Sequence, residues 1–309
     1  MGLYRAIRLR SRRLLPRAVR QWAGAYLQSR EADYRRIAQL PVAASGRSPD
    51  GMPYVQLQSG LVFYGYPPSD TQRFIYRHFT TSALRERLCE ESFGVAYNIV
   101  KRYLGPASPA DRLKQGKFYH LSRGEVVMEI GAYIGYYAMR AAELVGETGQ
   151  VIAVEAIDEN LRILRANVER NGFKNIVIVP KAAWNTSGKL TFFKPTGYRA
   201  SVFRSVVEAQ NTVEIPCDTV DAMLAELGVD HVSFVRIQVN GAEWEVLEGM
   251  SRTLDGNPKL LIAAIYEREG EPSWKRVVEV LRAKGYRTLV AGRGNVFAWK
   301  DNEVQEAAG

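Results

Sequence analysis

The sequence predicts an α/β protein whose mostly parallel sheet is covered by helices on both faces. Short apolar runs alternate with amphipathic segments from residue 125 onward, and the first run ends in a glycine turn. Parallel strands buried on both faces are continuous apolar runs, and a crossover helix joins each strand to the next. Two apolar runs flanking residues 292–295 predict a closing hairpin, which inserts one antiparallel strand.

The expected elements follow from apolar periodicity and from turn residues. Strands are expected at 126–130, 151–155, 176–179, 232–237, 260–265, 286–290 and 296–299, and helices at 136–144, 158–171, 219–227 and 273–284. Asp158 and Thr219 are the expected first residues of two of these helices, and Gly172 stops the first of them. Runs at 189–193 and 212–215 predict an antiparallel excursion from the main sheet.

The chain before residue 125 is expected to form an extension. Residues 31–60 form a polar connector, residues 54–66 predict a hairpin around Ser59-Gly60, and residues 82–104 have a helical pattern. We therefore divide the chain into an arginine-rich arm, an N-terminal extension or cap, a main domain and a tail. Their boundaries are 1–30, 31–110, 111–301 and 302–309.

Residues 1–30 contain eight arginines and no acid, and they account for all but one unit of the net charge of +9. A nucleic-acid surface needs cations spread over a folded face, so this distribution disfavours nucleic acid as a partner. The arm is either a solvated terminal helix or an amphipathic contact with an anionic membrane. No apolar run reaches the roughly 20 residues of a membrane span, and two cysteines make no disulfide framework. We expect a cytoplasmic protein, with peripheral contact at the inner membrane face as one use of the arm.

The glycine turn after the first strand places Glu129 before Gly131 and Gly135. It lacks the dinucleotide pattern Gly-x-Gly-x-x-Gly, and a carboxylate there would repel a pyrophosphate but suit a cationic ammonium. Glu155 ends the next strand, which is the position of the ribose-binding acid in dinucleotide sites. We expect it to accept hydrogen bonds from both ribose hydroxyls. These acids favour an adenosyl cofactor, S-adenosylmethionine (SAM), over the alternative of an ordinary tight turn.

Four ordered segments, 125–135, 151–172, 179–184 and 232–249, resemble the FkbM-type SAM-dependent methyltransferases. This resemblance covers roughly residues 90–300 and implies a class I, Rossmann-like seven-stranded fold with SAM as the methyl donor. It also implies O-methylation of a hydroxyl on a glycan or small-molecule natural product. The cofactor positions that it implies are Glu129, Gly131, Ala132, Tyr133 and Gly135 at the methionine side, Glu155 and Ala156 at the ribose, and Lys181 and Ala182 near the adenine.

The fourth segment departs from the family pattern Lys-Ile-Asp-Val-Glu, because Arg236 precedes amides at Gln238 and Asn240. An amide takes up no proton and is a weak ligand for a hard cation, so neither a base nor a metal site is expected there. Three accounts stay open: catalysis by alignment at Gln238 and Asn240, another base, or binding of SAM without catalysis. The candidates for another base are Glu243, Glu267, Tyr266 and His231. Glu243 would otherwise favour a helix N-terminus.

Two other functions are weighed against this one. The dipeptide Pro216-Cys217 is similar to the nucleophile of cytosine carbon-5 methyltransferases, but it precedes the fourth strand instead of following it. We therefore expect Cys217 to be a strand-end residue. The second rival is a degenerate SAM-binding domain that serves as an interaction scaffold.

Overall fold

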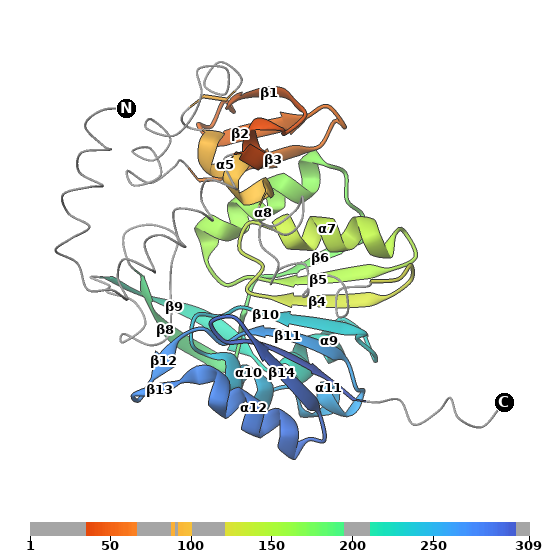
Figure 1. Cartoon of the computed structure of the whole chain (residues 1–309), viewed down its shortest axis with the longest axis vertical. Coiled ribbons are helices and arrows are strands. Elements are labelled where there is room, and N and C mark those ends of the chain that lie inside the picture. The colour runs from red at the N-terminus through yellow and green to blue at the C-terminus, as the bar shows by residue number, and fades with distance from the viewer. Residues whose placement is uncertain (1–34, 67–87, 90–91, 101–120, 195–210, 301–309) are drawn as a thin grey trace. The chain divides into compact units, whose positions relative to one another are not determined.

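The structure is a computed structural model, and it describes residues 35–66, 88–89, 92–100, 121–194 and 211–300 (Figure 1). The arm at 1–30, the tail at 302–309 and about half of the helix expected at 82–104 lie outside these residues. Membrane contact by the arm therefore stays a prediction. None of the described helices has both the length and the apolar character that spanning a membrane requires.

The chain divides into two compact units. The first contains residues up to 61 and 65–111, and the second contains 62–64 together with residues from 112 onward. In the first unit, β1 (Val42–Arg47) pairs antiparallel with β2 (Pro53–Leu57), and α5 (Phe93–Asn98) lies within the predicted helix. The prediction of a connector at 31–60 was wrong for β1, because its small and polar residues hide the alternation that marks a strand.

The second unit is built on a seven-stranded sheet with the order β14-β15-β11-β10-β4-β5-β6. Its strands are β4 (Val126–Ile130), β5 (Gln150–Val154), β6 (Ile176–Val179), β10 (Phe234–Ile237), β11 (Lys259–Ala263), β14 (Arg287–Ala291) and β15 (Asn295–Trp299). β15 pairs antiparallel with both of its neighbours, whereas the pairs among β11, β10, β4, β5 and β6 are parallel. The predicted sheet and its inserted antiparallel strand are confirmed.

Helices join these strands along the chain. They are α7 (Tyr136–Val145), α8 (Asp158–Arg170), α9 (Val220–Glu226), α10 (Glu243–Glu248), α11 (Ser251–Asp255) and α12 (Ser273–Ala283), and Figure 1 shows α7 beside β4 and β5 and α12 beside β14. From β4 the chain moves outward to β5 and β6, and it then returns to β10 on the other side. Right-handed crossovers in opposite directions put helices on opposite faces, so β4 and β10 flank the switch in strand order where such sheets bind ligands.

Of the two helix caps predicted from the sequence, the one at α9 is confirmed and the one at α8 is not. Thr219 caps α9, because its hydroxyl accepts the Ala222 N–H at 3.1 Å. Asp158 is the first helical residue of α8 and not its cap, which is Ile157. Its charge therefore acts at the positive end of the helix without making a capping hydrogen bond.

A small sheet of β7 (Ala182–Ala183), β8 (Gly188–Lys194) and β9 (Asn211–Asp218) forms the predicted excursion. β8 pairs antiparallel with β9, while β7 pairs parallel with it. A second excursion, the two-stranded pair β12 (Glu267–Arg268) and β13 (Glu271–Pro272), follows β11. Each excursion is inserted between two successive strands of the main sheet: the first between β6 and β10, and the second between β11 and β14.

Two asparagines, Asn167 in the last turn of α8 and Asn171 just after its end, hold β3 (Val62–Tyr64) as a neighbouring strand would. The Asn171 side chain accepts the Val62 N–H at 2.8 Å and donates to the Val62 carbonyl at 2.7 Å. The Asn167 side chain makes the same pair of contacts with Tyr64, at 2.6 and 3.1 Å. Asn167 also donates to the Ile134 carbonyl at 2.8 Å, so it connects β3 to the glycine turn.

Candidate functional site

The glycine turn lies against the ends of two neighbouring strands. The N–H groups of Gly131 and Ala132 both donate to the Val154 carbonyl at the end of β5, each at 2.9 Å. Gly131 has φ of 80°, and a Cβ there would lie 2.1 Å from the Gln238 carbonyl oxygen just past β10. A Cβ on Gly135 would lie 2.4 Å from a side-chain carbon of α8. Both glycines therefore permit close packing of the protein itself, in addition to any role toward a ligand.

Glu155 ties the glycine turn to the start of α8. Its Oε2 accepts the N–H of Tyr133 at 2.7 Å, and Tyr133 is held in the left-handed region with φ of 57°. Its Oε1 accepts from the backbone of Ala156 and Ile157 at 2.9 Å each and from the side chain of Asn160 at 3.1 Å. Burial raises the pKa of Glu155, and these hydrogen bonds oppose that shift.

The number of hydrogen bonds that each carboxylate oxygen of Glu155 already accepts indicates which oxygen can accept another from a ribose hydroxyl. Oε1 receives three hydrogen bonds from the described residues, whereas Oε2 receives one. Oε2 is thus the less occupied carboxylate oxygen and can accept a further hydrogen bond, such as one from a ribose hydroxyl. Glu155 therefore has the position expected of an acid that binds an adenosyl ribose, and its contact with both hydroxyls stays a prediction.

Glu129 is neutralised from within the protein. It is the register partner of Arg236 on β10, and the two buried side chains form an ion pair. The same guanidinium donates to Oε1 of Gln238 and lies 4.9 Å over the ring of Tyr137. The electrostatic reason for assigning Glu129 to an ammonium was therefore incomplete, because Arg236 balances its charge.

Asn240 stands at the second altered position, with φ of 54°. Its Oδ1 accepts the hydroxyl hydrogen of Tyr266 at 2.8 Å. Gln238 and Asn240 are both half-buried. The structure thus places both amides just past the carboxyl end of β10, where the Gln238 backbone lies against Gly131 of the glycine turn.

Glu243 is completely buried at the start of α10, where its Oε1 accepts the Gly241 N–H at 2.9 Å. Burial raises its pKa to about 7, and the hydrogen bond from Gly241 acts in the opposite direction. A carboxyl group without exposed surface contacts no acceptor in this conformation. The helix-terminus interpretation of Glu243 therefore agrees with the structure better than the interpretation as a base.

The other candidate bases are placed differently. His231 is exposed and precedes the amino end of β10, which is the end opposite Gln238, so the prediction of His231 as a base was wrong. Glu267 is exposed on β12. Tyr266 reaches the site, but its hydroxyl donates to Asn240.

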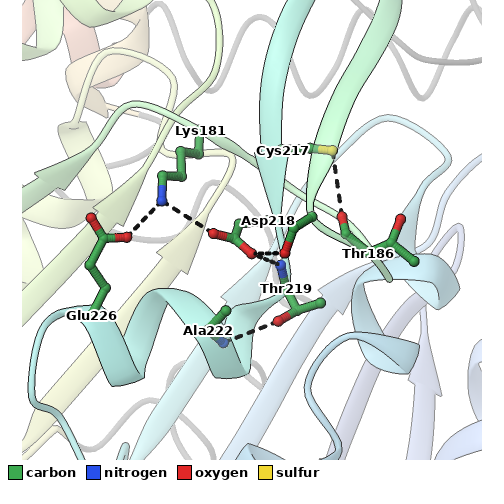
Figure 2. Close-up of polar contacts among 8 residues, drawn as sticks. Lys181, Thr186, Cys217, Asp218, Thr219, Ala222 and Glu226 are labelled. Carbon is green, nitrogen blue, oxygen red and sulfur yellow. Dashed lines mark hydrogen bonds and ion pairs between the residues drawn. The ribbon is translucent and has the colours of Figure 1, made fainter.

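Lys181, the residue predicted near the adenine, lies between two acids (Figure 2). Its ammonium is 3.2 Å from Asp218 at the end of β9 and 2.6 Å from Glu226 on α9. Ser187 donates to Asp218 at 2.6 Å, and this contact and Lys181 lower the pKa of the Asp218 carboxyl. Lys181 joins the excursion to α9 in this conformation. Ala182 beside it is buried in β7.

Cys217 is the strand-end residue that was expected. It is the next-to-last residue of β9, buried, with its thiol 3.5 Å from the Thr186 carbonyl (Figure 2). Burial raises the pKa of the thiol, and the Asp218 carboxylate raises it further. A raised pKa disfavours the thiolate that a covalent methyltransferase needs.

Several residues around the site had no sequence signal that identified them. Arg268 on β12 is paired with Glu245 at 2.8 Å, stacks 3.5 Å over the ring of Trp244 and donates to the Gly241 carbonyl at 2.9 Å. The separation along the chain between Arg268 and these three partners matches neither a helical nor a strand repeat, so no sequence pattern predicts the contacts. Asn160 could have been found, because it lies five residues after Glu155 in the first turn of α8.

Comparison with known proteins gives a family match over residues 129–288, to the methyltransferase FkbM domain. This segment is just over half of the chain. A shorter match is to protein-L-isoaspartate O-methyltransferase 1 of Archaeoglobus fulgidus, 42% identical over 59 residues, which are 19% of this chain and 27% of that protein. The enzyme of the same name from Thermotoga maritima is 33% identical over 85 residues, 28% of this chain and 27% of its own. The chain thus spans about a quarter of these relatives.

Solved structures show similarity at low identity. The methyltransferase FkbM of Methylobacillus flagellatus KT has a TM-score of 0.46 at 15% identity, with 79% of this chain and 63% of that chain covered. Fibrillarin of Aeropyrum pernix, solved with natively bound SAM, has a TM-score of 0.43 at 15% identity, with 84% and 99% covered.

Proposed function

Since the chain belongs to the FkbM family of SAM-dependent methyltransferases, we propose that it methylates an oxygen atom of a glycan or natural product. The proposal of oxygen as the acceptor atom is supported by the short matches to curated O-methyltransferases. It is also supported by the residues beside the glycine turn. None of the side chains that we assign to the site is a thiol. Positions 238 and 240, which depart from the family pattern, carry amides, and amides form hydrogen bonds with oxygen-containing groups.

One observation carries the proposal. The turn after β4 and the acid after β5 are joined by the hydrogen bond from Tyr133 to Glu155, at the switch in strand order. Oε2 of Glu155 can accept a further hydrogen bond, such as one from a ribose hydroxyl, and charge-assisted bonds of this kind are among the stronger ones. We assign the ribose of SAM to Glu155 and the methionine part to the glycine turn.

The residues of this chain position the acceptor and do not deprotonate it. Bound SAM supplies a methyl group that its sulfonium already activates. Gln238 and Asn240, which follow β10, hold the acceptor by hydrogen bonds and take up no proton. Alignment of two reactants accounts for a large part of the acceleration in many reactions, about 7–11 kcal/mol at most. Catalysis by alignment is therefore the account that we propose.

The test has two stages. Calorimetry measures binding of SAM and of its demethylated product, S-adenosylhomocysteine. SAM carrying a radiolabelled methyl group is then incubated with the chain and with glycan, lipid and small-molecule extracts of the source cells. We expect binding of both compounds and transfer of label to the extract. Failure to bind SAM, or to label any extract, would refute the proposal.

The alternative function is a SAM-binding scaffold without catalysis. The observation that favours it is the loss of both carboxylates at 238 and 240. It predicts binding of SAM with no transfer of label to any extract. A nucleic-acid methyltransferase is a weaker alternative, because the basic charge is concentrated in residues 1–30 and Cys217 is buried before β10.

A further inference from the structure

The two halves of the glycine turn are held by different elements. In the first half, the N–H groups of residues 131–133 are accepted at the end of β5, by the Val154 carbonyl and by Glu155 after it. In the second half, the carbonyl of Ile134 accepts a hydrogen bond at 2.8 Å from the side chain of Asn167 on α8. The position of the second half therefore depends on Asn167.

The Asn167 side chain is itself fixed in orientation. It is completely buried, its Oδ1 accepts the Tyr64 N–H at 2.6 Å, and its Nδ2 donates to the Tyr64 carbonyl at 3.1 Å as well as to Ile134. An amide nitrogen carries two hydrogens, and both are in use here. Rotation of the amide would leave these buried groups unsatisfied, which is costly. Asn167 therefore relates the position of Ile134 to that of β3.

A second contact joins β3 to the residue that follows the turn. Tyr136, the first residue of α7, is buried, and its hydroxyl donates to the same Tyr64 carbonyl at 3.1 Å. Its ring lies against Phe63, with the ring centroids 5.5 Å apart. Burial raises the pKa of the Tyr136 hydroxyl, so this group stays a donor at neutral pH. β3 is thus connected both to the end of the turn and to the start of α7.

From these contacts we propose that Asn167 is a positioning residue for the methyl donor: it holds the second half of the glycine turn, through Ile134, for the methionine part of SAM. This inference rests on the proposed function, which assigns the methionine part to the turn. The ribose is assigned to Glu155, which holds the first half, so the ribose contact should not depend on Asn167. Coupling of this kind is reciprocal, so a ligand that fixes Ile134 should also strengthen the hold of Asn167 on Tyr64.

Two ligands separate the two halves of the turn. S-adenosylhomocysteine carries the amino-acid part, whereas 5′-methylthioadenosine keeps the adenine and ribose and lacks that part. In Asn167→Ala we expect calorimetry to show an affinity for S-adenosylhomocysteine about tenfold weaker than in wild type, the equivalent of one net hydrogen bond. The affinity for methylthioadenosine, measured by competition, should stay within about twofold of wild type. A merely structural role would lower both affinities alike.

Asn171→Ala is the matched control. Asn171 makes the same pair of contacts with Val62 in β3, and its other hydrogen bonds to the described residues go to Asn167 and Met139, not to the turn. Both affinities should stay within about twofold of wild type in this variant. The inference would be overturned by an equal loss of S-adenosylhomocysteine affinity in the two variants, by an equal loss for both ligands in Asn167→Ala, or by no loss. Wild-type protein that fails to bind S-adenosylhomocysteine would refute the proposed function as well.

Hydrogen exchange in the wild-type protein decides the matter even where Asn167→Ala does not fold. Each ligand is used at the same multiple of its own Kd, which stabilises the folded state equally. The Tyr64 amide, which donates to Asn167, should exchange about fivefold or more slowly with S-adenosylhomocysteine than with methylthioadenosine. The Val62 amide, which donates to Asn171, is the reference and should exchange equally with both. Equal exchange of the Tyr64 amide with the two ligands would overturn the inference and leave the proposed function standing.

Discussion

Arg236 and Glu129 are register partners on the adjacent strands β10 and β4, and they form a buried ion pair at the switch in strand order. The exposed fractions of their side chains are 9% and 2%. The pair therefore decides both the stability of the site and its charge. It also orients Gln238, so one contact connects the core of the sheet to the proposed acceptor position.

Removing the cation from this pair should destabilise the fold strongly. Arg236→Met leaves the buried Glu129 carboxylate without the cation of its ion pair, which costs about 3–5 kcal/mol of unfolding free energy in comparable cases. Chemical denaturation measures this loss. Arg236→Lys keeps the charge and should recover most of the stability, and adding Glu129→Met to Arg236→Met should do so too. If Arg236→Met unfolds at the same denaturant concentration as wild type, the ion pair contributes little.

Glu155→Ala should weaken SAM binding by roughly 1–3 kcal/mol, because it removes a charge-assisted hydrogen bond to the ribose. It also removes the acceptor of four hydrogen bonds, so the variant should be less stable as well. Calorimetry gives the affinity and thermal unfolding gives the stability. Asn160→Ala removes one donor and keeps the carboxylate, so it should leave SAM affinity nearly intact. Equal affinity in wild type and Glu155→Ala would exclude the ribose role.

Gly131→Ala should destabilise the protein whether or not SAM is present. A Cβ at Gly131 would meet the Gln238 carbonyl oxygen at 2.1 Å, and its φ of 80° is strained for alanine. Gly172→Ala is the matched control, because Gly172 has φ of 70° with nothing within 4 Å of the added Cβ. We expect the loss at Gly131 to exceed the loss at Gly172 by about 1–3 kcal/mol in chemical denaturation. Similar losses would show that the turn adapts to the added carbon.

Glu243 should make stability depend on pH. Burial raises its pKa from 4.5 to about 7, so the folded state holds a proton that the unfolded state has released. Its contribution is complete below pH 4.5 and is lost as the pH rises through 7. Glu243→Gln keeps an acceptor for Gly241 and does not titrate. Its unfolding free energy relative to wild type should increase between pH 5 and pH 8, by at most about 3 kcal/mol. A difference independent of pH would show that Glu243 is ionised in the fold at all these values.

Much of the fold could be predicted because each strand of the main sheet carries its own local signal. The apolar run 126–130 and the helix cap at Thr219 are found where the sequence places them. Strand β1 and the first turn of α8 differ, since a weakly alternating strand and a helix start without a side-chain cap give little local signal. The positions of Glu155 and the glycine turn followed from strand ends, but the hydrogen bonds that Glu155 already accepts did not.

The sequence alone determined the family, the parallel sheet and the loss of two carboxylates at 238 and 240, because these are properties of residues read in order. Only the tertiary structure decided which partner each polar group has. Arg236 neutralises Glu129, Tyr266 binds Asn240, and the oxygen of Gln238 faces Arg236. The physical reason is that a charge or an amide has its chemical role set by the nearest donor and acceptor in space. Those neighbours come from other strands, and no local pattern in the chain encodes them.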